Sequence, residues 1–385
     1  MLSHVLVGQG PVASQFDANG YIAHVWALNA VSASHRYVVC EIGAEGPGTL
    51  QPTIDLVQPS VGVVTLVGLE HKSAFQTLDA VAEEKQTLVA ALPKSGLALL
   101  NRDDPRVLAM ASRTQARVVT FGTSDGDYRI ARVGASMPGQ LTVTIAHKGE
   151  AFEVQTQLTG AHQSLAVAAA FACAHQLGAP ASLIASRLAS YQPVFGRCST
   201  HQMADGPLFI VDTVKAPYYS IYLPINMMAE FDAPRKRIVI GQISDAGNTN
   251  PKYRDVYRAC RSVADQVIFV GDNAHRSKAT PEEIEAGRFV EKRNVKEAAE
   301  FVKDTAVPGE IILLKSSSYL HLERIFLDYE GEVRCWEQSC GKVKDCLRCG
   351  SYAIPFERGK KQKGGDKWKR YAAPRRSVDP SQRLA

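Results

Sequence analysis

The sequence predicts an α/β protein with parallel sheets and more than one domain. Short apolar runs typical of buried strands alternate with segments of helical periodicity along most of the chain. The 385 residues suffice for two domains, and hydrophobic and charged contents of 45% and 22% are near globular averages. Charged residues end several apolar runs, and the carboxyl ends of parallel strands are where such sheets bind ligands. We therefore expect ligand-binding residues at these strand ends.

The first half of the chain is expected to form one sheet with covering helices. Residues 1–36 are expected to be the rest of a helix and a connecting loop. Strands are expected at 37–42, 61–67, 97–100 and 118–121. Alternating segments separated by Pro-Gly and Lys-Gly predict a small β excursion within 128–156. A buried helix is expected at 158–177, where Gly178 ends it.

The stretch from residue 61 to 105 holds an unusual lysine. Its first apolar run reaches Glu70 and His71. One face of the following helix carries Leu78, Val81, Leu88 and Leu92. Lys85 falls on that same face. Its stem could pack on the core while the ammonium reaches water. Alternatively, desolvation leaves a reactive amine that can take up carbon dioxide, and the resulting carbamate suits magnesium.

The second half predicts a Rossmann-like sheet. An apolar strand at 209–212 ends on Asp212, and further apolar strands are expected at 237–241, 266–271 and 311–315. Helical segments near 251–264 and 295–303 separate them.

Four cysteines near the C-terminus are closely spaced. Cys335, Cys340, Cys346 and Cys349 give the pattern C-x4-C-x5-C-x2-C. Four thiolates at this density favour tetrahedral zinc, which would fold a segment too short for its own core. An iron-sulfur cluster and unliganded thiols are the alternatives. The four cysteines elsewhere are expected to be ordinary buried thiols.

The net charge of +5 comes from the C-terminal tail, since residues 351–385 carry +7 and the remainder −2. A polar, basic tail is expected to be disordered. Trp368 and Tyr371 could stack on bases there, so nucleic-acid binding is an alternative role. Apolar runs are too short for a membrane span and no signal peptide is evident, so a cytoplasmic protein is expected.

Several short motifs occur together in a telling order and spacing: Glu41-Ile42-Gly43-Ala44, Gly46, Gly48, His71, Glu84-Lys85, Leu92-Pro93, Asn101 and Asp103-Asp104-Pro105. This set resembles the central domain of the Mur ligases, ATP-dependent enzymes that join an amino acid or peptide to a carboxylate in peptidoglycan synthesis. The pattern is most similar to the member that adds D-alanyl-D-alanine. The resemblance implies that Glu41 and His71 help hold Mg²⁺ and that Lys85 is carbamylated, with all three serving catalysis.

The resemblance also implies residues that bind ATP. Asn101 and His162 lie in matching motifs, although Gln163 and Ala166 replace two asparagines of the family's adenine-contacting segment. Residues 193–197 match the family's P-x-x-G-R, which places Arg197 near the phosphates.

The second domain would contribute further ATP contacts. The acid that matches Asp212 belongs to an ATP-binding loop in the family. Lys215 suits phosphate as a point charge, or is an exposed loop lysine. Lys315-Ser316-Ser317 resembles a family Lys-Gly-Ser near the amino substrate, with serine for glycine.

The expected organisation is a Mur-ligase-like central ATPase domain at 1–197, a Rossmann-like domain at 198–330, a four-cysteine knuckle at 331–350 and the basic tail at 351–385. The phosphate-binding loop G-x-x-x-x-G-K-[ST] does not occur in the sequence. Three explanations are possible: the start codon is misassigned, the sequence is a fragment, or the protein has lost its phosphate-binding loop. The first domain is expected to be truncated.

The expected function is ATP-dependent ligation of a small-molecule or peptide carboxylate to an amine through an acyl phosphate, with ATP, Mg²⁺ and Zn²⁺ bound. The alternative is a non-catalytic scaffold on a retired ligase fold.

Overall fold

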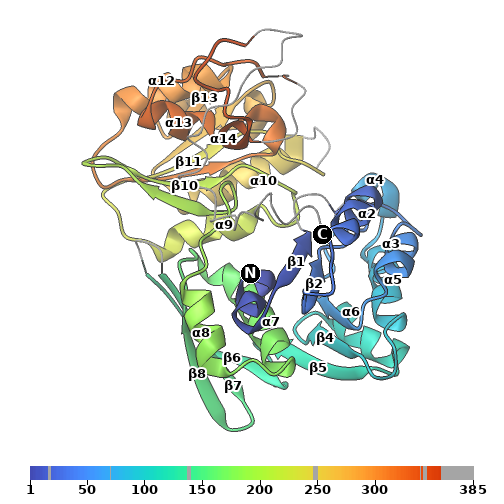
Figure 1. Cartoon of the computed structure of the whole chain (residues 1–385). Helices are drawn as coiled ribbons and strands as arrows, with labels where there is room; N and C mark the ends of the chain where they lie inside the picture. The colour runs from blue at the N-terminus through green and yellow to red at the C-terminus, as the bar shows by residue number, and fades with distance from the viewer. Residues whose placement is uncertain are drawn as a thin grey trace. The chain divides into compact units, whose positions relative to one another are not determined.

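The structure is a computed structural model that describes residues 1–15, 19–69, 71–136, 140–245, 250–338, 340 and 345–356. It divides the chain into two compact units, unit 1 (Met1–Tyr191) and unit 2 (Gln192–Ala385), which are described separately (Figure 1). The domain boundaries expected from the sequence stay predictions. The predicted basic tail lies, from residue 357 on, outside the described residues.

Unit 1 contains a mixed six-stranded sheet of order β3-β4-β5-β6-β7-β8. Its parallel strands are β3 (Val61–Val64), β4 (Leu97–Asn101) and β5 (Arg117–Gly122). An antiparallel extension follows, formed by β6 (Tyr128–Ser136), β7 (Gln140–His147) and β8 (Glu150–Gln155). The predicted strands and the predicted β excursion are therefore confirmed.

Helices of unit 1 cover this sheet. The apolar, alanine-rich helix α7 (Ser164–Gln176) buries nine residues against β4 to β7, in agreement with the expected buried helix. Small side chains let this helix approach the strands closely. The other helices are α1 (Leu2–Leu6), α2 (Tyr21–Asn29), α3 (Leu50–Val57), α4 (Lys72–Phe75), α5 (Leu78–Ala90), α6 (Pro105–Ala109) and α8 (Ala181–Ala189).

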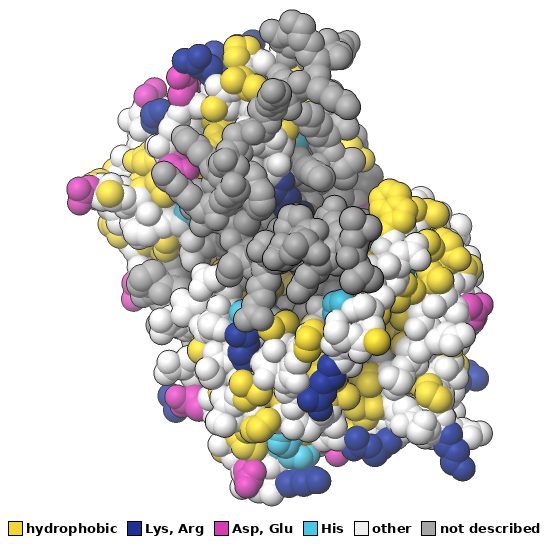
Figure 2. Space-filling view, viewed as in Figure 1, with side chains coloured by type: hydrophobic (Ala, Val, Ile, Leu, Met, Phe, Trp, Pro, Cys, Tyr) yellow, Lys and Arg dark blue, Asp and Glu magenta, His cyan; other side chains and the backbone are white. Residues whose placement is uncertain are grey.

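The expectation of helix and loop for residues 1–36 is wrong in part. β1 (Val12–Gln15) pairs in parallel with β2 (Tyr37–Cys40), and α2 lies between them in sequence. A four-residue strand whose partner lies 25 positions away leaves little local pattern to detect. Tyr21, Ile22 and Trp26 of α2 are exposed, and Figure 2 shows hydrophobic side chains gathered over this part of unit 1.

Unit 2 contains a six-stranded sheet of order β13-β12-β11-β14-β10-β9. Five strands are parallel, namely β10 (Leu208–Asp212), β11 (Lys236–Ile240), β12 (Gln266–Val270), β13 (Phe289–Lys292) and β14 (Ile311–Lys315). The antiparallel edge strand β9 (Ser199–Gln202) completes the sheet. The predicted alternation of parallel strands and helices is confirmed, whereas β9 and β13 are short, partly polar strands that the sequence pattern does not reveal.

The helices of unit 2 are α9 (Tyr222–Met227), α10 (Asn250–Arg261), α11 (Pro281–Glu285), α12 (Val295–Thr305), α13 (Arg324–Glu330) and α14 (Cys346–Cys349). α12 begins with an Asn294 side chain that accepts a hydrogen bond from the Glu297 amide, a usual N-terminal cap. Along the described residues, we find no helix with the length and apolar character that a membrane span requires.

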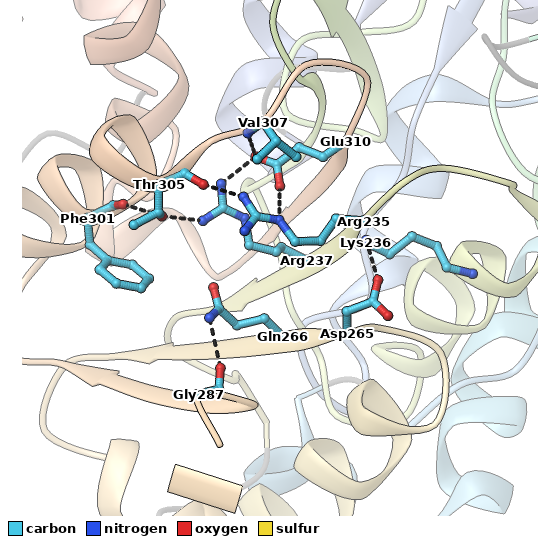
Figure 3. Close-up of polar contacts among 10 residues, drawn as sticks. All are labelled: Arg235, Lys236, Arg237, Asp265, Gln266, Gly287, Phe301, Thr305, Val307 and Glu310. Carbon is cyan, nitrogen blue, oxygen red and sulfur yellow. Dashed lines mark hydrogen bonds and ion pairs between the residues drawn. The ribbon is translucent and has the colours of Figure 1, made fainter. Parts of the chain in front are cut away.

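A buried polar network lies at the amino ends of β11 and β14 (Figure 3). The Arg237 guanidinium is 2.5 Å from the Glu310 carboxylate, and both side chains are fully buried. Arg235 binds the other Glu310 oxygen, and Arg237 also donates to the Thr305 hydroxyl. The network thereby joins two neighbouring strands to the end of α12.

Candidate active site

A second buried ion pair lies at the opposite, carboxyl end of the unit 2 sheet. Asp212 ends β10 and Lys315 ends β14, and the two are direct register partners on adjacent parallel strands. The Lys315 ammonium is 2.6 Å from Asp212 Oδ2 and 2.7 Å from the Lys215 carbonyl oxygen. Both side chains of the ion pair are buried. Lys315 therefore fixes the loop that carries Lys215 to the ligand-binding edge of the sheet.

The turn that carries Arg197 is held against the same loop. The carbonyl oxygen of Gly196 accepts hydrogen bonds from the Thr213 and Val214 amides at 3.1 and 3.2 Å. Gly196 has a φ of +77°, and an added Cβ would lie 2.7 Å from a Val214 methyl group. Glycine is therefore required at this position, for both its conformation and its lack of a side chain.

These contacts bring three of the predicted ATP-binding residues together at one strand end. Asp212 is buried, whereas the side chains of Arg197 and Lys215 are exposed. Lys315 neutralises Asp212, so the positive charges of Arg197 and Lys215 are not balanced by that carboxylate. Such an excess of positive charge favours a polyanionic ligand.

Ser316 stands where the family has glycine, and the structure accommodates its side chain. The Ser316 hydroxyl accepts a hydrogen bond from the Gln242 amide at 3.0 Å and donates to the Ser317 carbonyl oxygen at 2.9 Å. Gly241 lies opposite, and any Cβ there would clash with Ser316. The missing side chain at Gly241 therefore leaves room for the Ser316 hydroxyl.

Cys198 lies close to the Asp212 and Lys315 pair. Burial, followed by the charge of Asp212, raises the pKa of the Cys198 thiol well above its usual value. A thiol in this state is a poor nucleophile. Its expected role as an ordinary buried thiol agrees with this environment.

In unit 1, α5 presents two adjacent residues with different surroundings. Lys85 is half-buried, whereas Glu84 is buried and its carboxylate accepts hydrogen bonds from the Gly48 and Leu50 amides, both at 2.7 Å. Successive helix residues point about 100° apart, so Glu84 secures the start of α3 while Lys85 points elsewhere. The sequence analysis placed Lys85 on the apolar face of this helix and gave Glu84 no role.

Glu41 follows β2, and its backbone is fixed on both sides. Its amide donates to the Gln15 carbonyl oxygen at 2.9 Å, and its carbonyl oxygen accepts from the buried His24 ring at 3.0 Å. The Glu41 carboxylate itself is exposed, with the Asn19 amide 3.5 Å away. It is therefore accessible to a ligand.

His71 is exposed, with a φ of +49°, at the start of α4. Within the described part of unit 1, no three His, Cys, Asp or Glu ligand groups gather around Glu41 or His71. Their joint role with Lys85 stays a prediction. Glu70 lies outside the described residues.

Two other predicted ATP-binding residues have different surroundings. Asn101 is buried at the end of β4, where its side-chain amide donates to the Thr65 carbonyl oxygen at 2.7 Å and accepts from the Asp103 amide at 2.9 Å. Asn101 thus joins the ends of β3 and β4. His162 is half-buried in a short 3₁₀ turn (Ala161–Gln163). No contact of either residue tests its predicted role.

Lys315 is the site residue that sequence reasoning noted without assigning to the site. A signal existed, because the apolar run of β14 ends on this lysine just as the run of β10 ends on Asp212. Opposite charges at the ends of two apolar runs indicate a pair if the two strands are neighbours. The strand order was the missing information.

The four clustered cysteines have unequal surroundings. Cys346 and Cys335 are buried and lie 3.1 and 3.8 Å from Arg324 nitrogens. Cys340 Sγ is 3.3 Å from Nε2 of His321, and Cys349 is half-buried in α14. The structure does not confirm the four-cysteine zinc site, which stays a prediction.

Comparison with known sequences finds a family model that matches part of the chain. Residues 7–174 match the Mur ligase middle domain. The UDP-N-acetylmuramoyl-tripeptide--D-alanyl-D-alanine ligase of Mycobacterium tuberculosis (strain CDC 1551 / Oshkosh) is 26% identical over 374 residues, covering 89% of this chain and 71% of that protein. The protein of the same name from Mycobacterium bovis is 30% identical over 260 residues, 64% of this chain, and the chain spans half of its length.

Solved structures share the fold. MurF from Acinetobacter baumannii has a TM-score of 0.75 at 22% identity, covering 85% of this chain and 72% of that one. MurF ligase from Thermotoga maritima, in complex with ADP, has a TM-score of 0.73 at 20% identity, covering 86% and 75%. A pseudomurein peptide ligase type C from Methanothermus fervidus has a TM-score of 0.64 at 17% identity, covering 85% and 75%.

Proposed function

Since these comparisons confirm the resemblance to the Mur ligase family over most of the chain, we propose that the protein is an ATP-dependent ligase that joins a carboxylate to an amine. The observation that best supports this function is the strand end where Lys315 binds both Asp212 and the Lys215 carbonyl oxygen. Arg197 is held beside this strand end through Gly196. The arrangement suits the phosphates of a nucleotide.

The proposed reaction has two steps. A carboxylate oxygen of the substrate attacks the γ-phosphorus of ATP, ADP leaves, and an acyl phosphate forms. The amine nitrogen then attacks the acyl carbon, inorganic phosphate leaves, and a proton is released as the amide forms. Catalysis of this kind depends mainly on positioning and charge stabilisation.

The residues of unit 2 would bind and orient the nucleotide. Arg197 can donate two parallel hydrogen bonds to phosphate oxygens, and Lys215 supplies a point charge. Asp212 would act through Lys315, because it holds the ammonium at a fixed position. We also propose that Asn101 and His162 of unit 1 contribute to nucleotide binding, as the family resemblance implies.

Glu41, His71 and Lys85 of unit 1 are proposed to hold a magnesium ion that arrives with the nucleotide. Mg²⁺ usually keeps several waters and takes one or two protein oxygens together with substrate phosphates. The Glu41 and His71 side chains are exposed and Lys85 is half-buried, which supports the proposal because each is open to a ligand. Lys85 as a carbamate would add an oxygen ligand. When bound, the ion would neutralise phosphate charge.

The acceptor is proposed by class. The relatives' name specifies UDP-N-acetylmuramoyl-tripeptide and D-alanyl-D-alanine, which makes these the first substrates to assay here. A panel of other peptide carboxylates and amines should follow. Because ATP is drawn from the cytoplasmic pool, we propose a cytoplasmic location.

A non-catalytic scaffold remains the second candidate. It is favoured by Asn101, whose amide is engaged in internal hydrogen bonds, and by Ala166 in the adenine-contacting segment. Such a protein would bind a partner without consuming ATP.

The decisive experiment measures ADP release with ATP, Mg²⁺ and the first substrate pair, together with calorimetric binding of Mg²⁺ and ADP. We expect Lys85→Ala to abolish substrate-dependent ADP release. Lys94→Ala, which removes an exposed lysine of the same unit, should leave it unchanged. If the wild-type protein neither binds the nucleotide nor releases ADP with any pair of the panel, the ligase proposal fails and the scaffold leads.

A further inference from the structure

Three ligand-type side chains from two separate segments meet in the interior of unit 2. His321 follows the end of β14 by six residues, Glu323 immediately precedes α13, and Cys346 begins α14. Their ligand atoms all lie within 4.8 Å of one another. The exposed fractions are 2%, 1% and 4%, so water does not solvate this cluster freely.

One carboxylate oxygen in the cluster lacks a partner. Glu323 Oε1 accepts a hydrogen bond from the Cys346 amide at 2.8 Å and lies 3.3 Å from His321 Nδ1. Oε2 of the same carboxylate is buried and has no hydrogen-bond partner among the residues that the structure describes. A buried carboxylate oxygen in that state is costly and calls for an explanation such as a bound ion.

We propose that His321, Glu323 and Cys346 bind one divalent cation of the zinc class. Two ligands that are each about 2.0 to 2.1 Å from a tetrahedral zinc lie roughly 3.3 to 3.4 Å apart. The 3.3 Å between His321 Nδ1 and Glu323 Oε1 matches that spacing, and the unpartnered Oε2 belongs to the same carboxylate. A thiolate and an imidazole beside one carboxylate select zinc over magnesium.

The surrounding residues suit the outer layer of such a site. Cys340 Sγ lies 3.3 Å from Nε2 of His321, where it can accept the proton of that nitrogen and leave Nδ1 for the metal. Arg324 donates from Nε to Cys346 Sγ at 3.1 Å, which holds the sulfur atom beside the other two ligand groups.

The proposed ligand set differs from the four-cysteine pattern that the sequence suggests. It uses one thiolate instead of four, and it adds two residues, His321 and Glu323, that precede the cysteine cluster in the chain. Cys335 contacts Arg324 instead of the group of three. Three protein ligands leave a fourth position for water. Because His321 is close in sequence to Lys315, a bound ion would also restrain the segment that leaves β14.

The first test uses the wild-type full-length protein. After incubation with Zn²⁺ and desalting, we expect about one zinc per chain by mass spectrometry. After loading with Co²⁺ instead, the sulfur-to-cobalt charge-transfer absorption should have the intensity of one thiolate. An intensity that corresponds to four thiolates would overturn the proposal in favour of the four-cysteine site, and zinc content below a tenth of an equivalent would overturn both.

Single variants then separate the two ligand sets. Zinc affinity should fall more than about 100-fold in each of the variants His321→Ala, Glu323→Gln and Cys346→Ser. In Cys340→Ser, which changes an outer-layer residue, zinc affinity should fall about tenfold. Cys349→Ser should bind zinc like the wild type, as should Cys260→Ser, a control at a buried cysteine elsewhere in the unit. Wild-type affinity in Glu323→Gln together with loss in Cys349→Ser would overturn the assignment. If a variant does not fold, the cobalt spectrum of the wild type still decides.

Discussion

The sheet of unit 2 buries one ion pair at each end, and the two pairs differ in what surrounds them. At the amino end, Arg237 and Glu310 lie among further internal partners, with Arg235 on the same carboxylate and the Thr305 hydroxyl on the guanidinium (Figure 3). At the carboxyl end, Lys315 and Asp212 are also buried. That pair adjoins two loops whose cationic side chains are exposed.

The difference shows that a buried ion pair by itself does not mark a functional site. Both pairs join neighbouring strands, and removing one partner of either leaves an uncompensated buried charge. The exposed cationic side chains beyond the pair, Arg197 and Lys215, are the reason why we propose the carboxyl end as the ligand-binding end. This agrees with the general position of ligands in parallel sheets.

The largest effect is expected at the amino end. Glu310→Gln leaves the fully buried Arg237 guanidinium without a carboxylate, so the free energy of unfolding should fall by about 3 to 5 kcal/mol. Urea denaturation measures this. Glu300→Gln, at an exposed ion pair in the same unit, should change it by less than about 1 kcal/mol. A loss for Glu310→Gln as small as that of this control would mean that the network is not structural.

Removing the ion pair at the carboxyl end should weaken nucleotide binding. The double variant Asp212→Asn/Lys315→Met removes both charges, so it leaves no unpaired ion, yet ADP affinity should fall about 10- to 100-fold because the Lys215 loop loses its anchor. Calorimetry with Mg²⁺ and ADP measures this.

The matched control is Arg237→Met/Glu310→Gln, which removes the other pair. Its folded form should keep wild-type ADP affinity. Equal affinities in the two double variants would break the distinction between the two ends.

The close approach of Gly241 and Ser316 at the carboxyl end can be tested by substitution. Gly241→Ala places a methyl group against Ser316 and should lower the free energy of unfolding by about 1 to 3 kcal/mol. In a Ser316→Gly background the cost should be smaller, and a double-mutant cycle measures that coupling. Additive effects would show that contact with the Ser316 side chain is not the cause of the cost of Gly241→Ala.

The last effect concerns acid stability, to which we expect His201 of the edge strand β9 to contribute. Burial lowers the pKa of His201 to about 4, so the folded state keeps the ring neutral. The unfolded state takes up a proton below about pH 6.5, and stability should therefore fall by about 1 to 3 kcal/mol between about pH 6.5 and 4. His201→Gln should flatten this decline in thermal unfolding, whereas the exposed His275→Gln should not. An unchanged slope in His201→Gln would assign the decline to another group.

Much of the fold can be predicted from the sequence because its parallel strands are continuous apolar runs. β4, β10 and β14 are buried at every position, and their periodicity alone identifies them. β1 and β9 could not be predicted in this way. Both have four residues; β9 is itself an edge strand, and β1 pairs with a strand 25 positions along the chain, so tertiary pairing decides them.

The candidate site divides in a similar manner. Short motifs predicted Arg197, Asp212 and Lys215, and the contacts of Gly196 and Lys315 bring these residues together. The partner of Asp212 could not be identified without the strand order. The group of His321, Glu323 and Cys346 depends on the packing of two separate segments, and no spacing within the cysteine cluster points to it.

The Glu84 carboxylate occupies two backbone amides of unit 1 that could otherwise bind an anion. By accepting the Gly48 and Leu50 amides, it occupies the backbone donors at the start of α3, where a phosphate or carboxylate group could otherwise bind. The helix is thus supplied with an internal anion, which also satisfies the positive end of its dipole. These two amides are therefore not available to bind another anion.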